Sequence, residues 1–335
     1  MSKKLRIGSI GTGTWAQNFQ IPAWRQLSDI CEYIGMYNRT YSKAKVYADA
    51  NGLKAYESLE ELFDNCDAVD ISVAHNSHLK YTKAALENKK HVMLQKPLVT
   101  TREALKELCD VQKKSGKVLM PYMMNRYRED FVKGKEIVAS GVLGDILFVK
   151  SYNATTPPYG EFFISKKQAG GGVMITLGLH MLDILHWYFG KPGKIYHTQS
   201  NQLNNQYFIH NKNIVGDVED NYTAMFDFNG VPAFLNTNWY LSENERKGQG
   251  FQETLEVIGT KGKLKIDAPS PEPVKLFLND KGAVDVSVKE SRSCYNLQKE
   301  FVMAIEENRT PMPSFEDAVT DLKTLFDMYE MSGDM

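Results

Sequence analysis

The chain has 335 residues, of which 42% are hydrophobic and 24% are charged. These proportions exclude a disordered or fibrous chain, and the length suits two domains of about 100 to 200 residues each. Forty Lys and Arg residues against 41 Asp and Glu residues leave a net charge of -1. No global basic field is therefore available to attract nucleic acid or acidic membranes.

The four cysteines, Cys31, Cys66, Cys109 and Cys294, are widely spaced and form no CxxC pair. This spacing argues against a disulfide framework and against a structural zinc site, and it fits a reducing cytosol. The N-terminal residues are typical of a strand and a glycine turn instead of a signal peptide, and no run of about 18 apolar residues predicts a transmembrane helix. We therefore expect a cytoplasmic protein.

Up to about residue 120, short apolar runs alternate with amphipathic stretches, which is the βαβ pattern of a parallel sheet. The pattern predicts strands over residues 5–10, 32–37, 68–73, 91–94 and 118–122. Ser58 with Glu61, and Thr100 with Glu103, have the capping-box spacing that marks the start of a helix.

After about residue 125 the pattern changes. Helices are predicted over 130–140, 173–189, 297–306 and 315–329, and strands over 222–228, 233–239, 254–259, 263–266 and 274–278. This order predicts an α+β domain over 125–335 with a large, mostly antiparallel, open-faced sheet. The Asn- and Gln-rich stretch 201–213 is expected to be a mobile loop.

A glycine-rich turn, Gly11-Thr12-Gly13-Thr14-Trp15-Ala16, follows the first predicted strand as GxGxxA. Gly11 permits a tight turn, Gly13 lets the backbone approach a pyrophosphate, and Ala16 allows close packing of helix on strand. Thr14 and Trp15 begin a helix whose N–H groups and dipole favour an anion. The alternative is a plain glycine turn. In this βαβ context the motif predicts a Rossmann dinucleotide-binding domain over residues 1–124.

The end of the second predicted strand bears on the choice of cofactor, because NAD enzymes carry a carboxylate there for the ribose hydroxyl. Here the chain reads Tyr37-Asn38-Arg39-Thr40 and has no carboxylate. Arg39 could pair with a 2′-phosphate through charge-assisted bonds worth roughly 1.5 to 3 kcal/mol. We expect NADP as the cofactor, with NAD possible and Asn38 and Arg39 in contact with it. The alternative is that Arg39 is a solvated loop residue.

Two further segments complete a pattern: residues 91–98, HVMLQKPL, and residues 170–183, GGGVMITLGLHMLD. With the glycine turn they resemble the Gfo/Idh/MocA oxidoreductases, whose marks are GxGxxG/A, an EKP at the end of a strand and GGGxxxDxGxHxxD. Further matches are His75-Asn76-Ser77-His78, Asn125-Arg126-Tyr127 and residues 256–262. The likeness covers nearly the whole chain.

The resemblance implies an NAD(P)-dependent dehydrogenase or reductase acting on a sugar, a cyclic polyol or a related carbohydrate. In such enzymes the EKP lysine bonds both the cofactor and the reacting hydroxyl, and a histidine of the glycine-rich helix is the acid/base, so Lys96 and His180 match those roles. Two residues depart from the pattern: Gln95 replaces the glutamate, and Thr176 replaces an aspartate that often assists. The candidate cofactor contacts from the matching segments are His75, Asn76, His78, Gln95, Lys96 and Asn125.

The chemistry of Lys96 and His180 also follows from their side chains. A histidine with a pKa near neutrality can accept the hydroxyl proton, and an ammonium beside the same oxygen stabilises developing alkoxide. Asp183 lies three residues after His180 and either orients it or is a buried structural partner. Further candidates for sugar contact are Tyr122, Arg126, Asn153, Tyr159, Thr176 and Trp239.

Two other patterns carry weaker expectations. His180, Asp183 and His186 form an HxxDxxH series, but this spacing spreads the three side chains around a helix, so no metal site is predicted. The pair Arg246-Lys247 is expected to be a solvated loop, or a phosphate contact for a nucleotide sugar.

Three alternatives to a simple sugar dehydrogenase remain open. They are a nucleotide-sugar dehydrogenase or ketosugar reductase, a glycosidase that retains NAD, and a non-catalytic dinucleotide-binding regulator. An open-faced sheet also needs covering, so we expect a homodimer or homotetramer with a small-molecule carbohydrate substrate and no nucleic-acid or membrane partner.

Overall fold

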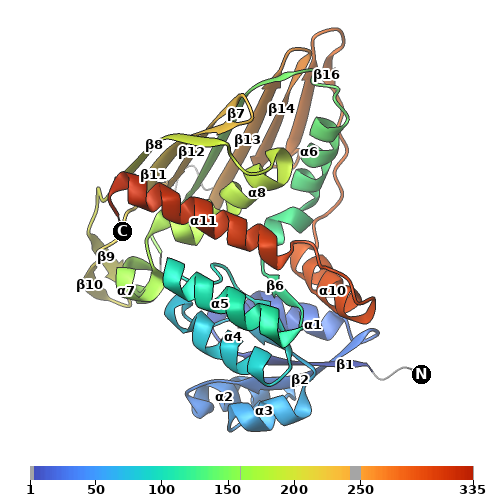
Figure 1. Cartoon of the computed structure of the whole chain (residues 1–335), viewed down its shortest axis with the longest axis vertical. Coiled ribbons are helices and arrows are strands. Elements are labelled where there is room, and N and C mark those ends of the chain that lie inside the picture. The colour runs from blue at the N-terminus through green and yellow to red at the C-terminus, as the bar shows by residue number, and fades with distance from the viewer. Residues whose placement is uncertain (1–3, 159, 242–249, 335) are drawn as a thin grey trace. The chain divides into compact units, whose positions relative to one another are not determined.

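The computed structural model describes residues 4–158, 160–241 and 250–334 (Figure 1). Tyr159 and the pair Arg246-Lys247 lie outside the described residues. The chain divides into two compact units, Met1–Met124 with Arg292–Val319 and Asn125–Ser291 with Thr320–Met335. The sequence predicted a second domain over residues 125–335, whereas Arg292–Val319 clusters with the first unit.

The first unit is built on a six-stranded parallel sheet with the order β3-β2-β1-β4-β5-β6. Its strands are β1 (Leu5–Ile10), β2 (Cys31–Tyr37), β3 (Ala55–Tyr56), β4 (Ala68–Ile71), β5 (His91–Leu94) and β6 (Leu119–Pro121). All four residues of β4 are buried, which fits the almost continuously apolar run from which this strand was predicted. This is the strand order of a Rossmann fold, and it places the chain crossover between β1 and β4.

Helices connect these strands. They are η1 (Ala16–Gln20), α1 (Ile21–Gln26), α2 (Tyr41–Asn51), α3 (Leu59–Asn65), η2 (His75–Ser77), α4 (His78–Glu87) and α5 (Arg102–Ser115). Ser58 caps α3 by accepting from the backbone N of Glu61 at 3.0 Å, as predicted. The cap of α5 is Thr101 instead of the predicted Thr100, because the Thr101 hydroxyl reaches the N of Ala104 at 3.2 Å. Helices α4 and α5 lie together as one layer (Figure 1).

Helix α10 (Ser293–Glu306) joins the first unit through its apolar face. Phe301 is fully buried, and its ring centroid lies 6.2 Å from that of Trp24 in α1. The Gln298 amide donates to the carbonyl of Gln20 at 3.1 Å. Burial of these side chains against α1 is why a helix from the end of the chain completes the first unit.

The second unit is built on an eight-stranded sheet with the order β16-β15-β14-β13-β7-β12-β11-β8. Its strands are β7 (Ile146–Thr155), β8 (Lys194–Asn201), β11 (Asn221–Phe228), β12 (Val231–Asn238), β13 (Phe251–Gly259), β14 (Gly262–Ala268), β15 (Val274–Leu278) and β16 (Gly282–Val284). Strands β7 and β12 pair in parallel, and the other neighbours pair antiparallel. The prediction of a mostly antiparallel sheet is confirmed.

The predicted mobile loop over 201–213 is wrong. Strands β9 (Gln206–Ile209) and β10 (Lys212–Val215) form an antiparallel hairpin in this region. Asn204 orders the approach to it, since its amide donates to the carbonyl of Gln206 and its oxygen accepts from the N of the same residue. The Asn-rich composition therefore belongs to a hairpin and to the turn bonds that precede it.

The helices of the second unit are α6 (Glu129–Ala139), η4 (Glu161–Ile164), α7 (Lys166–Ala169), η5 (Met174–Gly178) and α8 (Leu179–Phe189). Two further helices, η3 (Met124–Tyr127) and α11 (Phe315–Ser332), cross the division between the units. Helices α6 and α8 cover one face of the large sheet (Figure 1). The helical run 166–189 has the length and hydropathy of a membrane span, but 83% of its apolar window is buried inside the protein, as in a core helix.

Candidate active site

The glycine turn after β1 has the geometry that its sequence predicts. Gly11 has φ +102°, and a Cβ there would lie 2.0 Å from the carbonyl oxygen of Ser72. Its N donates to the carbonyl of Tyr37 at 2.8 Å, which joins the turn to the end of β2. Only glycine fits this position, because both the left-handed backbone and the close carbonyl exclude a side chain.

The next residues leave room for a ligand. A Cβ at Gly13 would meet nothing within 4 Å, and Thr14, where the helix begins, is exposed. Ala16 is 2% exposed and packs in a cluster with Ile21 and Met36. An open backbone before a helix N-terminus, backed by a small packing residue, fits the pyrophosphate of a dinucleotide.

The loop after β2 is held to the glycine turn by Asn38. Its amide donates to the Thr12 hydroxyl at 2.7 Å, and its oxygen accepts from the N of Thr40 at 2.9 Å. Arg39, between these contacts, is exposed. Asn38 thus orders the loop, while the guanidinium of Arg39 is accessible from solvent.

The loop after β5 carries Gln95 and Lys96, both half-buried. The Gln95 side-chain oxygen accepts from the N of Lys96 at 3.3 Å, and the N of Gln95 donates to the carbonyl of Ile71 at 3.0 Å. Lys96 therefore lies at the carboxyl edge of the parallel sheet, where such folds bind ligands.

The segment after β4 holds three of the other predicted cofactor contacts. His75 is 6% exposed, and Asn76 is exposed at the turn before α4. His78 is fully buried, with Nδ1 2.6 Å from the carbonyl oxygen of Pro97 and Nε2 3.1 Å from that of Val73. Both ring nitrogens of His78 face backbone oxygens, so this ring contacts the loops after β4 and β5.

In the second unit, η5 and α8 place Thr176 and His180 one helical turn apart. The Thr176 hydroxyl donates to the carbonyl of Gly172 at 2.6 Å, which is a back-bond within its own helix. His180 lies in the first turn of α8 and is half-buried. The hydroxyl that replaces the usual aspartate thus bonds the glycine turn.

Glu219 supports this turn, and no motif in the sequence predicted its role. Its carboxylate accepts from the N of Gly172 at 2.7 Å and the N of Met174 at 3.1 Å. Tyr329 donates to the same carboxylate at 2.7 Å and accepts from the N of Ile175 at 3.2 Å. Burial raises the pKa of Glu219 to about 7, against the hydrogen bonds it accepts. Glu219 is far along the chain from both Gly172 and Tyr329, so no local sequence pattern predicts these contacts.

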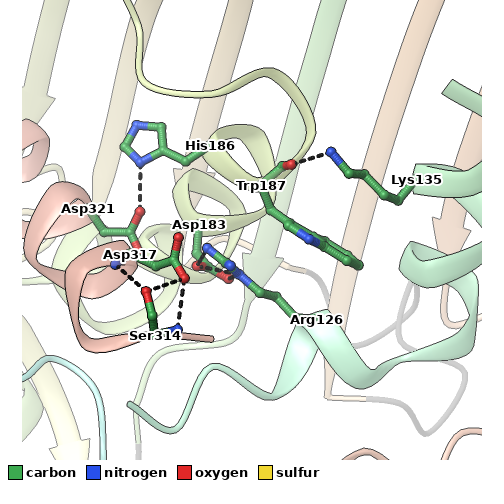
Figure 2. A network of polar contacts seen from close by, with 8 residues as sticks. All are labelled: Arg126, Lys135, Asp183, His186, Trp187, Ser314, Asp317 and Asp321. Carbon is green, nitrogen blue, oxygen red and sulfur yellow. Dashed lines mark hydrogen bonds and ion pairs between the residues drawn. The ribbon is translucent and has the colours of Figure 1, made fainter. Parts of the chain in front are cut away.

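Asp183 is a structural partner of Arg126 (Figure 2). The guanidinium donates to both carboxylate oxygens, with distances of 2.7 to 3.1 Å, and both side chains are buried. Burial raises the pKa of Asp183 to about 7; Arg126 opposes this shift, and the neighbouring Asp321 adds to it. Arg126 was predicted to bind substrate, but its guanidinium forms hydrogen bonds to the carboxylate of Asp183.

Other predicted contacts are also engaged within their own units. The Asn125 amide donates to Glu253 at 3.3 Å, and the Asn153 amide donates to the carbonyl of Leu177 at 3.1 Å. Trp239 is 4% exposed and packs edge-on against Tyr207 of β9. Tyr122 is 1% exposed at the end of β6. Burial of these rings reflects core packing, which the aromatic residue types alone could not distinguish from sugar binding.

No group of three His, Cys, Asp or Glu side chains among the described residues has the arrangement of a metal site. In the HxxDxxH series, Asp183 bonds Arg126 and His186 Nδ1 lies 2.6 Å from Asp321 (Figure 2). The four cysteines are free thiols. Burial raises the pKa of Cys31 to about 12 and that of Cys66 to about 11, so neither is a thiolate at neutral pH.

Comparisons with known proteins agree with this geometry. The chain is 26% identical to an uncharacterised oxidoreductase of Synechocystis over 95% of this chain and 91% of that protein. It is 31% identical to D-glucoside 3-dehydrogenase of Escherichia coli, over 57% of this chain and 56% of that protein. The structure of levoglucosan dehydrogenase in complex with NADH superposes with a TM-score of 0.87 at 18% identity, covering 99% of this chain and 97% of that one, which is a likeness of fold.

Family matches cover both units. Residues 5–123 match the oxidoreductase family with an NAD-binding Rossmann fold, and residues 131–265 match the GFO/IDH/MocA C-terminal domain. The glycine turn at Gly11 and the strand order of the first sheet agree with the first match. The chain therefore belongs to the Gfo/Idh/MocA family of NAD-binding oxidoreductases.

Proposed function

We propose that the protein interconverts a hydroxyl and a ketone on a sugar, cyclic polyol or related carbohydrate. The observation that carries the proposal is Lys96, at the carboxyl edge of a sheet whose Gly11-Gly13 turn fits a dinucleotide. Support for the substrate class comes from the relatives, since one is named a D-glucoside 3-dehydrogenase and one structural neighbour a levoglucosan dehydrogenase.

In this proposal the backbone from Gly11 to Ala16 holds the pyrophosphate. A bound nicotinamide supplies or accepts the hydride of the reaction. The Lys96 ammonium donates a hydrogen bond to the reacting oxygen and stabilises negative charge as it develops there. A ring nitrogen of His180 accepts the hydroxyl proton in oxidation and returns it in reduction.

The choice between the two nicotinamide cofactors is assigned to Arg39. The loop after β2 offers no carboxylate to a ribose hydroxyl, and an accessible guanidinium there favours a 2′-phosphate. We propose NADP as the preferred cofactor, with NAD also bound. A cytoplasmic location and a homo-oligomeric state belong to the same proposal.

The test follows oxidation and reduction of NADP(H) and NAD(H) across free sugars, ketosugars, inositols and nucleotide sugars. We expect turnover with one substrate class, and loss of about 100- to 1,000-fold in kcat for Lys96→Ala, with binding of NADPH retained. Lys106→Ala, which removes an exposed lysine of α5, is the matched control.

Two results would overturn the proposal. Loss of NADPH binding in Lys96→Ala would contradict the role assigned to Lys96, because the loss of turnover would then follow from the loss of the cofactor. Silence across the whole panel, despite tight dinucleotide binding, would favour an NAD-retaining glycosidase or a non-catalytic regulator.

A further inference from the structure

His78 joins two loops at the carboxyl edge of the first sheet. It is the first residue of α4 and has no exposed surface. Its Nδ1 lies 2.6 Å from the carbonyl oxygen of Pro97, in the loop after β5, and its Nε2 lies 3.1 Å from that of Val73, after β4. One imidazole thus bridges the ends of two adjacent parallel strands.

The ring cannot donate to both carbonyl oxygens at neutral pH. Burial lowers the pKa of His78 to about 4, although the two backbone carbonyls act to raise it and the nearby charge of Lys96 lowers it further. A neutral imidazole has one N–H, and a carbonyl oxygen only accepts. One N–H can serve only one of the two carbonyl oxygens, and the shorter contact, 2.6 Å at Nδ1 against 3.1 Å at Nε2, favours the bond to Pro97.

This bond acts on the residue next to Lys96. The backbone on the N-terminal side of Lys96 is held to β4, because the N of Gln95 donates to the carbonyl of Ile71 at 3.0 Å. On its C-terminal side the carbonyl of Pro97 is held by His78. Two anchors, one on each side, fix the backbone from which the lysine side chain leaves.

We propose that His78 is a positioning residue for Lys96, which it orients by holding the Pro97 carbonyl through Nδ1–H. The inference rests on the proposed role of Lys96 in turnover. It replaces the predicted role of His78 as a cofactor contact, because both ring nitrogens face backbone oxygens inside the first unit.

Two substitutions of similar size separate the two contacts. In His78→Asn the amide nitrogen takes the place of Nδ1 and can still donate to Pro97. In His78→Gln the amide nitrogen takes the place of Nε2 and can reach Val73 instead. If His78 only had to supply a buried polar group, the two variants would behave alike. Urea unfolding of each variant measures the loss in the free energy of unfolding that the substitution causes.

Three measurements test the proposal on the full chain. Nitrogen-15 NMR of the imidazole should show a neutral Nδ1–H tautomer at pH 7. Competitive acetylation of lysines with acetic anhydride, read by peptide mass spectrometry, should give Lys96 the same pH profile in His78→Asn as in the wild type and a changed profile in His78→Gln. With the active substrate, kcat should fall about 100-fold in His78→Gln, the loss expected for a group misplaced by about 1 Å, and should be largely kept in His78→Asn.

An Nε2–H tautomer would overturn the proposal, and so would equal Lys96 profiles in both variants and the wild type. The tautomer and the acetylation profile need neither substrate nor cofactor. If the wild type turned over no carbohydrate, the proposed function would fail while these two readouts still decided the role of His78.

Discussion

Arg39 is the residue on which the cofactor preference depends. Arg39→Ala removes the guanidinium that would pair with a 2′-phosphate, a bond worth roughly 1.5 to 3 kcal/mol. We therefore expect the Kd for NADP to rise about 10- to 100-fold and the Kd for NAD to stay nearly unchanged. Isothermal titration with both cofactors measures this, with Arg25→Ala in α1 as the control. Equal losses for both cofactors would contradict a role in selection.

Asp70 in β4 is a buried carboxyl that makes stability depend on pH. It accepts from the Trp24 indole at 2.7 Å and the Gln20 amide at 2.8 Å, and burial raises its pKa to about 7. The folded state therefore holds this proton more tightly than the unfolded state, whose pKa is about 3.9. The stabilising contribution is fully present below about pH 4 and is lost as the pH rises through about 7.

Asp70→Asn removes this titration and keeps a polar group against Trp24 and Gln20. We expect the free energy of unfolding of the wild type, relative to the variant, to fall from pH 5 to about pH 7 and to level off above it in urea titrations. Glu219 and Asp183, whose pKa values burial also raises to about 7, titrate in both proteins and cancel in the difference. A difference independent of pH would mean that Asp70 is already ionised in the folded protein over this range, as it is in the unfolded chain, and would contradict a raised pKa.

The turn that begins η5 and α8 depends on Glu219. In Glu219→Gln, an amide replaces a carboxylate that accepts two backbone N–H groups and the Tyr329 hydroxyl, so one donor is left facing another donor. We expect a loss of about 1 to 3 kcal/mol in the free energy of unfolding, measured in urea. Tyr329→Phe should cost less, and Glu272→Gln, on an exposed loop, should cost nothing measurable.

The same turn shows how far local patterns reach. The triplet Gly170-Gly171-Gly172 predicted a helix start, and the helix is there. The reason for Gly172 appears only in the fold, since a Cβ there would lie 1.9 Å from the carbonyl oxygen of Glu219. Glu219 lies 47 residues later in the chain, so the sequence around Gly172 could not show that only glycine fits there.

The large sheet of the second unit has an outer face with exposed apolar residues. Met225 of β11 is 41% exposed and lies directly opposite Phe234 of β12, while Ala224 and Phe226 point to the buried face. An apolar pair on a sheet face favours burial against another copy. We predict a homodimer or homotetramer through this face.

Light scattering at micromolar concentration tests the assembly. Met225→Glu should shift the mass toward the monomer, because it places a charge in an apolar contact. Glu272→Gln again serves as the control. A monomeric wild type would contradict the prediction, and an unchanged mass in Met225→Glu would place the interface elsewhere.

The sequence predicts the parallel sheet, the glycine turn and the two-part organisation, because each depends on a pattern of residues that are close together in the chain. The alternation of apolar runs predicted β1 and β5 with their observed bounds, and the first glycine of GxGxxA, Gly11, has the positive φ that favours glycine in a tight turn. The family motifs likewise lie in continuous segments, which is why Lys96 and His180 could be named.

Partners far apart in the chain were decided only by tertiary packing. The sequence predicted Arg126 as a substrate contact, but in the fold its buried guanidinium pairs with Asp183. It predicted Trp239 as a sugar contact, but this ring packs edge-on against Tyr207. Helix α10 joined the first unit because its apolar face is buried on α1. The partner of a buried charge or ring is whichever group lies next to it in the folded chain. The topology of the fold determines which groups are neighbours, and their spacing along the sequence does not.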